Sequence, residues 1–310
     1  MSEAPALDPA LRDRALGAFL GLAVGDAIGT TLEFSARDEH PHHTEMTGGG
    51  PFRLAPGQWT DDTSMALALA DSLVSCGAFD PADLMRRFLA WYRDGAYSST
   101  GTCFDIGGAT ASALRRFEET GEPYAGSTSE GRAGNGSIMR LAPAVLFHLH
   151  DEEGAIRLAA AQGRTTHGAP QAVEGCMILA RMLHRAIRGV PSPFAPVPDW
   201  PGHPAIAALA AGSWRGKARE DISASGYAVH TLEAALWAVE ETGTFEDALI
   251  LAVNLGEDAD SVGAVAGQLA GALYGASAIP GRWLAPIAWR DRIEGWAERL
   301  VGWMDARQGV

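Results

Sequence analysis

Residues 17–29 read GAFLGLAVGDAIG, and residues 263–275 read GAVAGQLAGALYG. In each stretch a glycine recurs at every fourth position, which places all of these glycines on one face of a helix. A glycine inside a helix costs about 1 kcal/mol relative to alanine, so such a stripe is tolerable where it lets another backbone approach closely. We predict two buried, tightly crossed central helices, although part of the pattern could reflect the 37 glycines of the chain.

The rest of the chain is dominated by helical patterns. Alternating β-branched segments are nearly absent, which predicts an all-α fold. Residues 36–58 and 190–204 are rich in glycine or proline and are predicted to be irregular surface excursions, too short to separate two domains. We therefore expect one domain over residues 1–310, with its core at about residues 12–306. The blocks predicted as helices are Asp62–Val74, Pro81–Tyr92, Ala109–Glu119, Glu152–Gln162, Gln171–Arg188, Thr231–Glu241 and Arg292–Ala306.

Composition and charge narrow the class of protein. The net charge of −14 argues against a general nucleic-acid binder, which needs a basic face, but it leaves room for a local anion site. Three cysteines are too few and too scattered for a disulfide framework or a zinc site. The N-terminal residues do not resemble a signal peptide, and no apolar stretch reaches the roughly 20 residues that span a bilayer. We expect a cytoplasmic protein with neither a membrane nor a nucleic-acid partner.

Two acidic clusters carry the strongest chemical signal: Thr60-Asp61-Asp62-Thr63 and Asp258-Ala259-Asp260-Ser261. Each is followed at once by an apolar, helix-like run. If the fold brings them together, two carboxylates about 4 Å apart repel by roughly 4 kcal/mol at an effective dielectric near 20, so the cluster needs cations or protons. Oxygen-only ligands favour hard ions such as Mg²⁺, Mn²⁺ or Ca²⁺. The alternative, that each cluster simply caps a helix, is compatible with metal binding.

Three weaker signals lie between the clusters. Gly134-Asn135-Gly136-Ser137 precedes the apolar run at residues 138–149; such a turn can offer backbone N–H groups to a phosphate, or it can be an ordinary glycine-containing entry to a helix. His167 lies between two helical blocks, as a loop or capping histidine would. Asp105 ends a stretch rich in glycine and hydroxyl groups and could be a helix N-cap.

Taken together, the segments resemble the ADP-ribosylglycohydrolase family, whose best-known bacterial member is the dinitrogenase reductase-activating glycohydrolase. The resemblance implies a single compact, orthogonal all-α bundle that binds two divalent cations, Mg²⁺ or Mn²⁺. The matching segments follow the family's order over nearly the whole chain: GAFLGLAVGDAIGTTLEF, GQWTDDTSMALALADSL, TGTCFDIG, GNGSIMRLAPA, RTTHGAP, SGYAVHTLEAALWA and VNLGEDADSVGAVAGQLAGALYG.

The resemblance also assigns metal ligands and catalytic acids. Serine at position 261, where the family often has threonine, keeps an oxygen ligand. Some members place a catalytic acid slightly earlier than Asp105, where this chain has Ser98 and Ser99. The implied metal ligands are Thr60, Asp61, Asp62, Asp258, Asp260 and Ser261. The implied catalytic residues are Glu33, Asp61, Asp105 and Asp260, with Glu33 matching an acid that moves on and off the metal site in vertebrate relatives.

Substrate contacts are implied in the same way. The glycine-rich turn matches the loop that holds the diphosphate, His167 lies near the ligand, and Tyr227 matches an aromatic residue near the distal ribose. The implied substrate-binding residues are Gly134, Asn135, Gly136, Ser137, His167 and Tyr227.

The function implied is that of a metal-dependent hydrolase, acting as a monomer, that removes ADP-ribose from a mono-ADP-ribosylated protein. Arginine is the favoured acceptor, while serine and O-acetyl acceptors stay open, and ADP-ribose is the product. Cleavage of a glycosidic bond needs an activated water and a proton for the leaving group, which carboxylates can provide. Two alternatives remain: a metal-dependent nucleotide phosphohydrolase, and a non-catalytic ADP-ribose-binding protein of the same fold.

Overall fold

The computed structural model describes residues 8–308, and within this range the regular elements are helices, with three isolated β-bridges and no β-strand. The all-α prediction is confirmed. The α-helices are α1 (Pro9–Gly29), α2 (Asp61–Cys76), α3 (Pro81–Asp94), α4 (Gly108–Thr120), α5 (Ala142–Phe147), α6 (Glu152–Thr166), α7 (Pro170–Ile187), α8 (Pro204–Ala210), α9 (Ala228–Glu240), α10 (Phe245–Val253), α11 (Ala259–Tyr274), α12 (Gly281–Leu284) and α13 (Arg290–Gln308). Short 3₁₀ helices cover Glu130–Arg132, Arg219–Asp221 and Ala276–Ala278.

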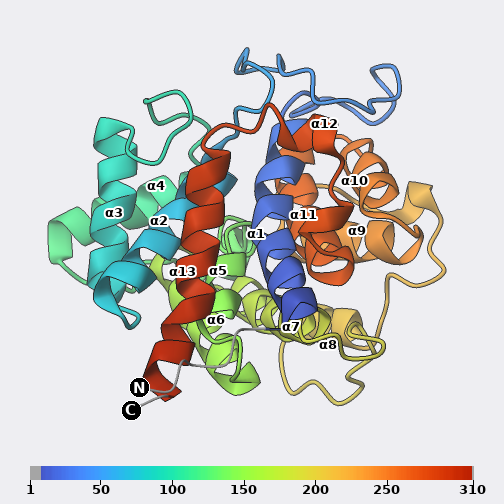
Figure 1. Ribbon diagram of the computed structural model, residues 1–310. Coiled ribbons are helices and arrows are strands. Elements are labelled where there is room, and N and C mark those ends of the chain that lie inside the picture. The colour runs from blue at the N-terminus through green and yellow to red at the C-terminus, as the bar shows by residue number, and fades with distance from the viewer. Residues whose placement is uncertain (1–7, 309–310) are drawn as a thin grey trace.

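Helices α1 and α11 lie side by side at the centre of the molecule (Figure 1). A Cβ atom on Gly21 would lie 2.1 Å from the carbonyl oxygen of Gly267, and one on Gly25 would lie 1.9 Å from that of Gly263. No side chain fits at such distances, so the two backbones touch directly. Because the glycine partners run in opposite directions along the chain, the helices are antiparallel and stay in contact along their length. The predicted pair of buried glycine-lined helices is confirmed.

The other helices surround this pair. Each block predicted as a helix coincides with α2, α3, α4, α6, α7, α9 or α13, and the observed ends differ from the predicted ones by no more than four residues. Buried side chains from Leu11 to Val301 form one hydrophobic cluster. The excursions predicted at residues 36–58 and 190–204 contain no helix apart from Pro204, where α8 begins. The first of them covers one end of the central pair (Figure 1). Among residues 8–308, no helix is both long and apolar enough to cross a membrane.

The apolar run at residues 138–149 differs from a continuous helix. Only Ala142–Phe147 is helical, and residues 137–141 form buried turns. Pro143 in the first turn of α5 limits extension toward the N-terminus, because its ring clashes with a preceding helical turn. The glycine-rich loop therefore does not open a helix directly.

Candidate functional site

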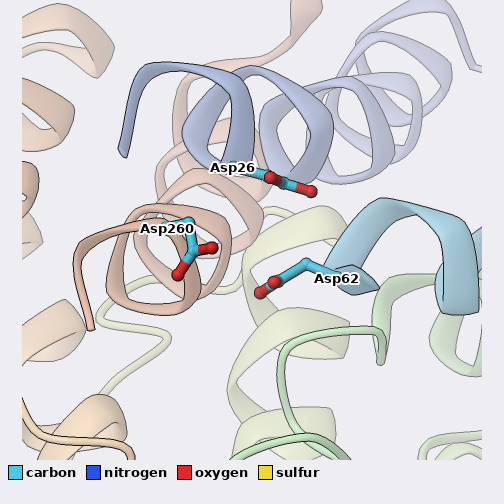
Figure 2. A group of neighbouring side chains, drawn as sticks. All are labelled: Asp26, Asp62 and Asp260. Atoms are coloured by element: carbon cyan, nitrogen blue, oxygen red, sulfur yellow. The ribbon is translucent and has the colours of Figure 1, made fainter. Parts of the chain in front are cut away.

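The two acidic clusters lie at the beginnings of α2 and α11, which converge on the C-terminal half of α1. Thr60 and Asp258 occupy N-cap positions, yet within residues 8–308 neither side chain makes a capping hydrogen bond. The interpretation that these side chains serve only as helix caps is therefore wrong. Carboxylates from the three helices, Asp26, Asp62 and Asp260, point toward one another instead (Figure 2).

The carboxylates form two overlapping groups. Asp26, Asp62 and Asp260 each offer an oxygen within 4.8 Å of the others, and Glu33, Asp258 and Asp260 do the same. Asp260 belongs to both groups. Two adjacent groups that share one carboxylate are an arrangement suited to a pair of cations.

The Thr60 hydroxyl shows that this cluster needs more positive charge or more protons. It lies 2.9 Å from an oxygen of Asp26, 3.1 Å from one of Asp62 and 3.2 Å from one of Asp260. A hydroxyl carries one hydrogen and can donate to only one of these oxygens. In addition, Oδ1 of Asp62 is buried and has no hydrogen-bond partner in the described part of the chain. These oxygen-only donors fit hard divalent cations.

The pKa values of the carboxyl groups in the metal-free cluster also indicate that it needs cations or protons. Burial, followed by the charge of Asp260, raises the pKa of Asp26 and that of Asp258 to about 7. The same two causes raise the pKa of Asp61 and of Glu33 far above the usual range of carboxyl groups. Without a cation the cluster therefore holds protons at neutral pH, and a bound cation would replace them.

A cavity of about 370 Å³ opens beside the cluster. Glu33, Asp61, Asp105, Asp258, Asp260 and Ser261 line it on the acidic side. The rest of the wall includes Gly134–Gly136, His167 and the N-terminal end of α4, residues 107–110. Among the described lining residues there is no lysine or arginine, so an anion would meet backbone N–H groups and a helix N-terminus on this wall.

Hydrogen bonds from buried polar side chains hold the glycine-rich loop in place. Arg140 donates to the carbonyl oxygen of Gly136 at 2.8 Å, and Gln162 donates to that of Ser137 at 2.9 Å. Gln268 of α11 accepts from the N–H of Ala142 and donates to the carbonyls of residues 138 and 139. Within residues 8–308 no backbone carbonyl accepts from the N–H groups of Gly134 or Gly136, which line the cavity, and this leaves them available to a ligand.

Three implied substrate-binding residues take different roles in this wall. The buried imidazole of His167 packs against the loop so closely that a Cβ on Gly136 would lie 2.7 Å from the ring. The side chain of Asn135 donates to Asp258 at 3.1 Å and to Thr231 at 3.0 Å, so it positions the second acidic cluster. Ser137 is fully buried beside Cys176 and is not among the residues that line the cavity.

Asp105, and neither Ser98 nor Ser99, faces the cavity. Ser99 instead accepts from the N–H of Trp59 and donates to its carbonyl oxygen. The N-cap of α4 is Gly107, so the interpretation of Asp105 as a cap is wrong. Burial raises the pKa of Asp105 to about 11, with further contributions from Asp61 and Asp260.

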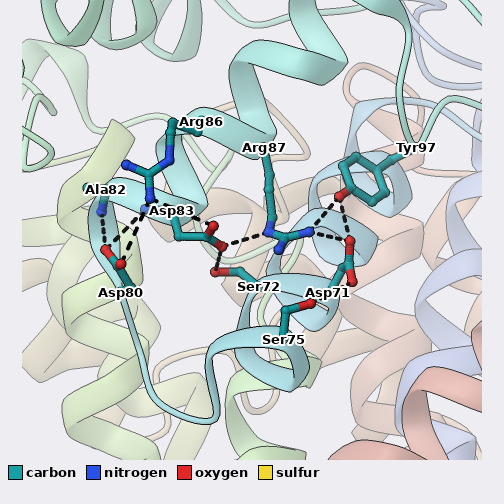
Figure 3. A network of polar contacts seen from close by, with 9 residues as sticks. All are labelled: Asp71, Ser72, Ser75, Asp80, Ala82, Asp83, Arg86, Arg87 and Tyr97. Atoms are coloured by element: carbon teal, nitrogen blue, oxygen red, sulfur yellow. Dashed lines mark hydrogen bonds and ion pairs between the residues drawn. The ribbon is translucent and has the colours of Figure 1, made fainter.

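A polar network fixes the loop that leads to Asp105 (Figure 3). Tyr97, at the start of the loop, donates to Asp71 at 2.7 Å and accepts from Arg87 at 3.0 Å. Arg87 also donates a hydrogen bond to Asp83 at 2.6 Å. Side chains of both α2 and α3 therefore hold the loop in position.

Tyr227 lies next to the glycine-rich loop but outside the acidic cavity. It lines a neighbouring hollow that shares Ala109, Gly134 and Gly226 with the acidic cavity, and its backbone forms a bridge with Gly134. The position is compatible with a contact to the far part of an extended ligand.

Sequence reasoning missed three features of the site. Asp26 was seen only as a residue of the glycine-lined helix, yet it belongs to the carboxylate cluster. The Gly107-Gly108 pair at the start of α4 lines the facing wall, and its signal was a glycine pair directly before a helical block. Phe34 lines the cavity next to Glu33 and is an exposed aromatic side chain.

Comparisons with known proteins agree with this geometry. Residues 7–309 match the sequence model of the ADP-ribosylglycohydrolase family. The chain is 49% identical to the ADP-ribosylarginine hydrolase Tri1 of Pseudomonas putida (strain GB-1), over 92% of this chain and 77% of that protein. It is 39% identical to the ADP-ribosyl-(dinitrogen reductase) glycohydrolase of Rhodospirillum rubrum, over 90% of this chain and 92% of that protein. A solved structure described as an ADP-ribosylglycohydrolase-related protein complex matches with a TM-score of 0.84 and 48% identity, covering 94% of this chain and 98% of that one. The chain therefore belongs to the ADP-ribosylglycohydrolase family.

Proposed function

We propose that the protein hydrolyses the N-glycosidic bond between ADP-ribose and an arginine side chain of a modified protein, using two divalent cations, Mg²⁺ or Mn²⁺. The observation that carries the proposal is a single cavity lined both by carboxylates and by backbone N–H groups that make no backbone hydrogen bond within residues 8–308. The relatives from Pseudomonas putida and Serratia proteamaculans, 49% and 46% identical, are both named ADP-ribosylarginine hydrolase, which supports arginine as the acceptor.

The two kinds of lining groups, backbone N–H groups and carboxylates, suit the diphosphate and the ribose of the substrate. Gly134–Gly136 and the N-terminus of α4 would bind the diphosphate through backbone N–H groups, which explains how a chain with a net charge of −14 takes an anionic ligand. The cations would be held by Asp26, Thr60, Asp61, Asp62, Asp258, Asp260 and Ser261. When bound, they supply Lewis-acid charge that orients the ribose and acidifies a water.

Hydrolysis breaks the bond between the anomeric carbon and the arginine nitrogen and forms a bond from that carbon to the water oxygen. One proton of the water ends on the departing nitrogen. Glu33 and Asp105 line the cavity and are not among the residues assigned above to the cations. One of them removes a proton from water while the other donates to the leaving group. Which carboxyl group plays which role is decided by comparing Glu33→Gln with Asp105→Asn.

The experiment is mass spectrometry of ADP-ribosyl-arginine and ADP-ribosyl-serine peptides incubated with the protein. We expect free ADP-ribose from the arginine peptide, no release in EDTA, and recovery with Mn²⁺ or Mg²⁺. Asp105→Asn should be inactive, while the matched exposed variant Asp94→Asn should behave like the parent. Release of AMP or phosphate would favour the phosphohydrolase alternative, and ADP-ribose binding without turnover would favour the non-catalytic one.

A further inference from the structure

Phe34 is an aromatic side chain exposed at the edge of the acidic cavity. Its side chain is 69% exposed, and among the described residues the other large exposed hydrophobic side chains are Tyr124 and Val190. Its backbone lies in the left-handed region, with φ of 60°. For a bulky residue this conformation is strained, and such strain persists only where the surrounding structure imposes it.

Two backbone hydrogen bonds impose this conformation. The N–H of Phe34 donates to the carbonyl oxygen of Glu257 at 2.8 Å, and the N–H of Glu257 donates to that of Ser35 at 2.8 Å. Phe34 directly follows Glu33, and Glu257 directly precedes Asp258. The bridge therefore fixes the backbone of Phe34 next to the segments that carry Glu33 and Asp258, and all three residues line the cavity.

Phe34 is part of an aromatic rim formed by Phe34, Phe52 and Phe104. The rings of Phe34 and Phe52 meet edge to face at 6.1 Å, and those of Phe52 and Phe104 lie 5.2 Å apart. Phe104 precedes Asp105, so the rim joins the segments that carry the two acids at the edge of the cavity. Phe52 comes from the excursion at residues 36–58 and contacts Phe34, although it does not itself line the cavity.

We propose that Phe34 is the recognition residue for the leaving group and that its exposed ring stacks on the guanidinium of the arginine side chain. The inference rests on the proposed function and extends it to acceptor specificity. A guanidinium is planar, permanently charged and weakly hydrated, and it binds both aromatic faces and carboxylates. Phe34 of the aromatic rim provides the aromatic face, and the nearby acids Glu33 and Asp105 provide the carboxylates. Phe34 directly follows Glu33, one of the two acids proposed to serve the water and the leaving group, and it lines the same cavity as the other, Asp105. We therefore place it on the side of the scissile bond where the acceptor departs.

The test separates contacts to the acceptor from contacts to ADP-ribose. We would measure kcat/KM on an ADP-ribosyl-arginine peptide, and separately the Kd of ADP-ribose from calorimetry, in the presence of Mn²⁺. Phe34→Ala and Phe34→Leu should both lower kcat/KM roughly 3- to 30-fold, because neither has an aromatic face. Both should leave the Kd of ADP-ribose unchanged, and Phe34→Trp should restore kcat/KM. Tyr124→Ala, at another exposed aromatic residue (52% exposed), is the control and should match the parent.

Each other outcome contradicts the proposal. Equal losses in kcat/KM and in ADP-ribose affinity would place Phe34 against the ADP-ribose moiety. Full activity in Phe34→Leu would reduce the contact to apolar packing, and parent-like values in Phe34→Ala would remove Phe34 from the site. If the parent binds ADP-ribose but does not cleave the arginine peptide, the proposed function fails, and this inference fails with it.

Discussion

Asp26 accepts hydrogen bonds at 2.9 Å from both the backbone N–H and the hydroxyl of Thr60. Its second oxygen accepts from the N–H of Thr63 at 3.0 Å and from the Thr63 hydroxyl at 2.6 Å. The carboxylate of α1 thus caps the first turn of α2, a role that α2's own N-cap side chain does not take. Asp26 is therefore both a structural acceptor of four hydrogen bonds and a member of the carboxylate cluster.

This double role predicts that Asp26→Asn and Asp61→Asn differ in stability. Asparagine at position 26 turns one acceptor oxygen into a donor group facing donors. We expect a loss of about 2 kcal/mol in the free energy of unfolding in EDTA, despite the relief of charge repulsion. Asparagine at position 61 replaces a carboxyl group whose charged form is disfavoured by burial and by Asp260, without a comparable loss of hydrogen bonds, so that variant should be at least as stable as the parent. Urea unfolding of the three proteins in EDTA checks this, and equal stabilities would contradict the capping role of Asp26.

The metal-free protein should lose stability as pH rises. Burial and the charge of Asp260 raise the pKa of Asp26 and of Asp258 from 3.8 to about 7 in the folded state. The folded protein therefore binds more protons than the unfolded chain between these values, and the resulting stabilisation is lost as pH rises through about 7. Urea unfolding in EDTA from about pH 5 to about pH 8 measures this trend, and saturating Mn²⁺ should weaken it. Stability that rises with pH in EDTA would show that these carboxyl groups are ionised without a cation.

The contact between the glycine-lined helices predicts opposite signs for two glycine-to-alanine changes. A Cβ on Gly267 would lie 1.9 Å from the carbonyl oxygen of Gly21, so Gly267→Ala must force α1 and α11 apart and should cost 3 kcal/mol or more, roughly the upper range of overpacking. Gly295 lies inside α13 with nothing within 4 Å of a built Cβ, so Gly295→Ala should stabilise by about 1 kcal/mol. Thermal melts of both variants check this. A Gly267→Ala protein as stable as the parent would mean that the two helices separate easily.

Much of this architecture could be predicted from local patterns. The four-residue glycine repeat indicated the central pair because its period is a property of one helix, and the resemblance to the family is confirmed. Asp26 was missed as a site residue because a single acid in an apolar helix has no local partner, and its neighbours Thr60 and Asp260 are far away in sequence. The buried turns before α5 were missed for the same reason, since Gln268 of α11 satisfies their backbone groups.

Asp61 and Asp260 should act as a unit in catalysis. Both line the cavity, and the charge of Asp260 is the largest cause after burial of the raised pKa of Asp61. Asp61→Asn and Asp260→Asn should each abolish most turnover, and the double variant should be little worse than either one. Measurement of kcat for the three variants, with melting curves with and without Mn²⁺, checks this. Multiplicative losses together with an unchanged Mn²⁺-induced shift in Tm would place the two acids in independent sites.

Arg140 provides the last prediction, because it is a fully buried cation whose hydrogen-bond acceptors are all neutral. Its guanidinium stacks on Phe88 and bonds Gln162, Thr166 and the carbonyl oxygen of Gly136, the loop residue that lines the cavity. Burial lowers the pKa of Arg140 to about 9, so the group stays charged at neutral pH and places a positive charge beneath the proposed diphosphate site.

Arg140→Lys keeps the charge but cannot reproduce the planar fork of donors. We therefore expect the loop to loosen, KM for the arginine substrate to rise more than kcat falls, and the Tm increase caused by ADP-ribose to shrink. Arg93→Lys, in an exposed ion pair with Glu118, is the matched control and should match the parent in all three quantities. If Arg140→Lys lowers Tm but leaves KM and the ADP-ribose-induced shift unchanged, Arg140 serves the core alone and the loop binds its ligand without it.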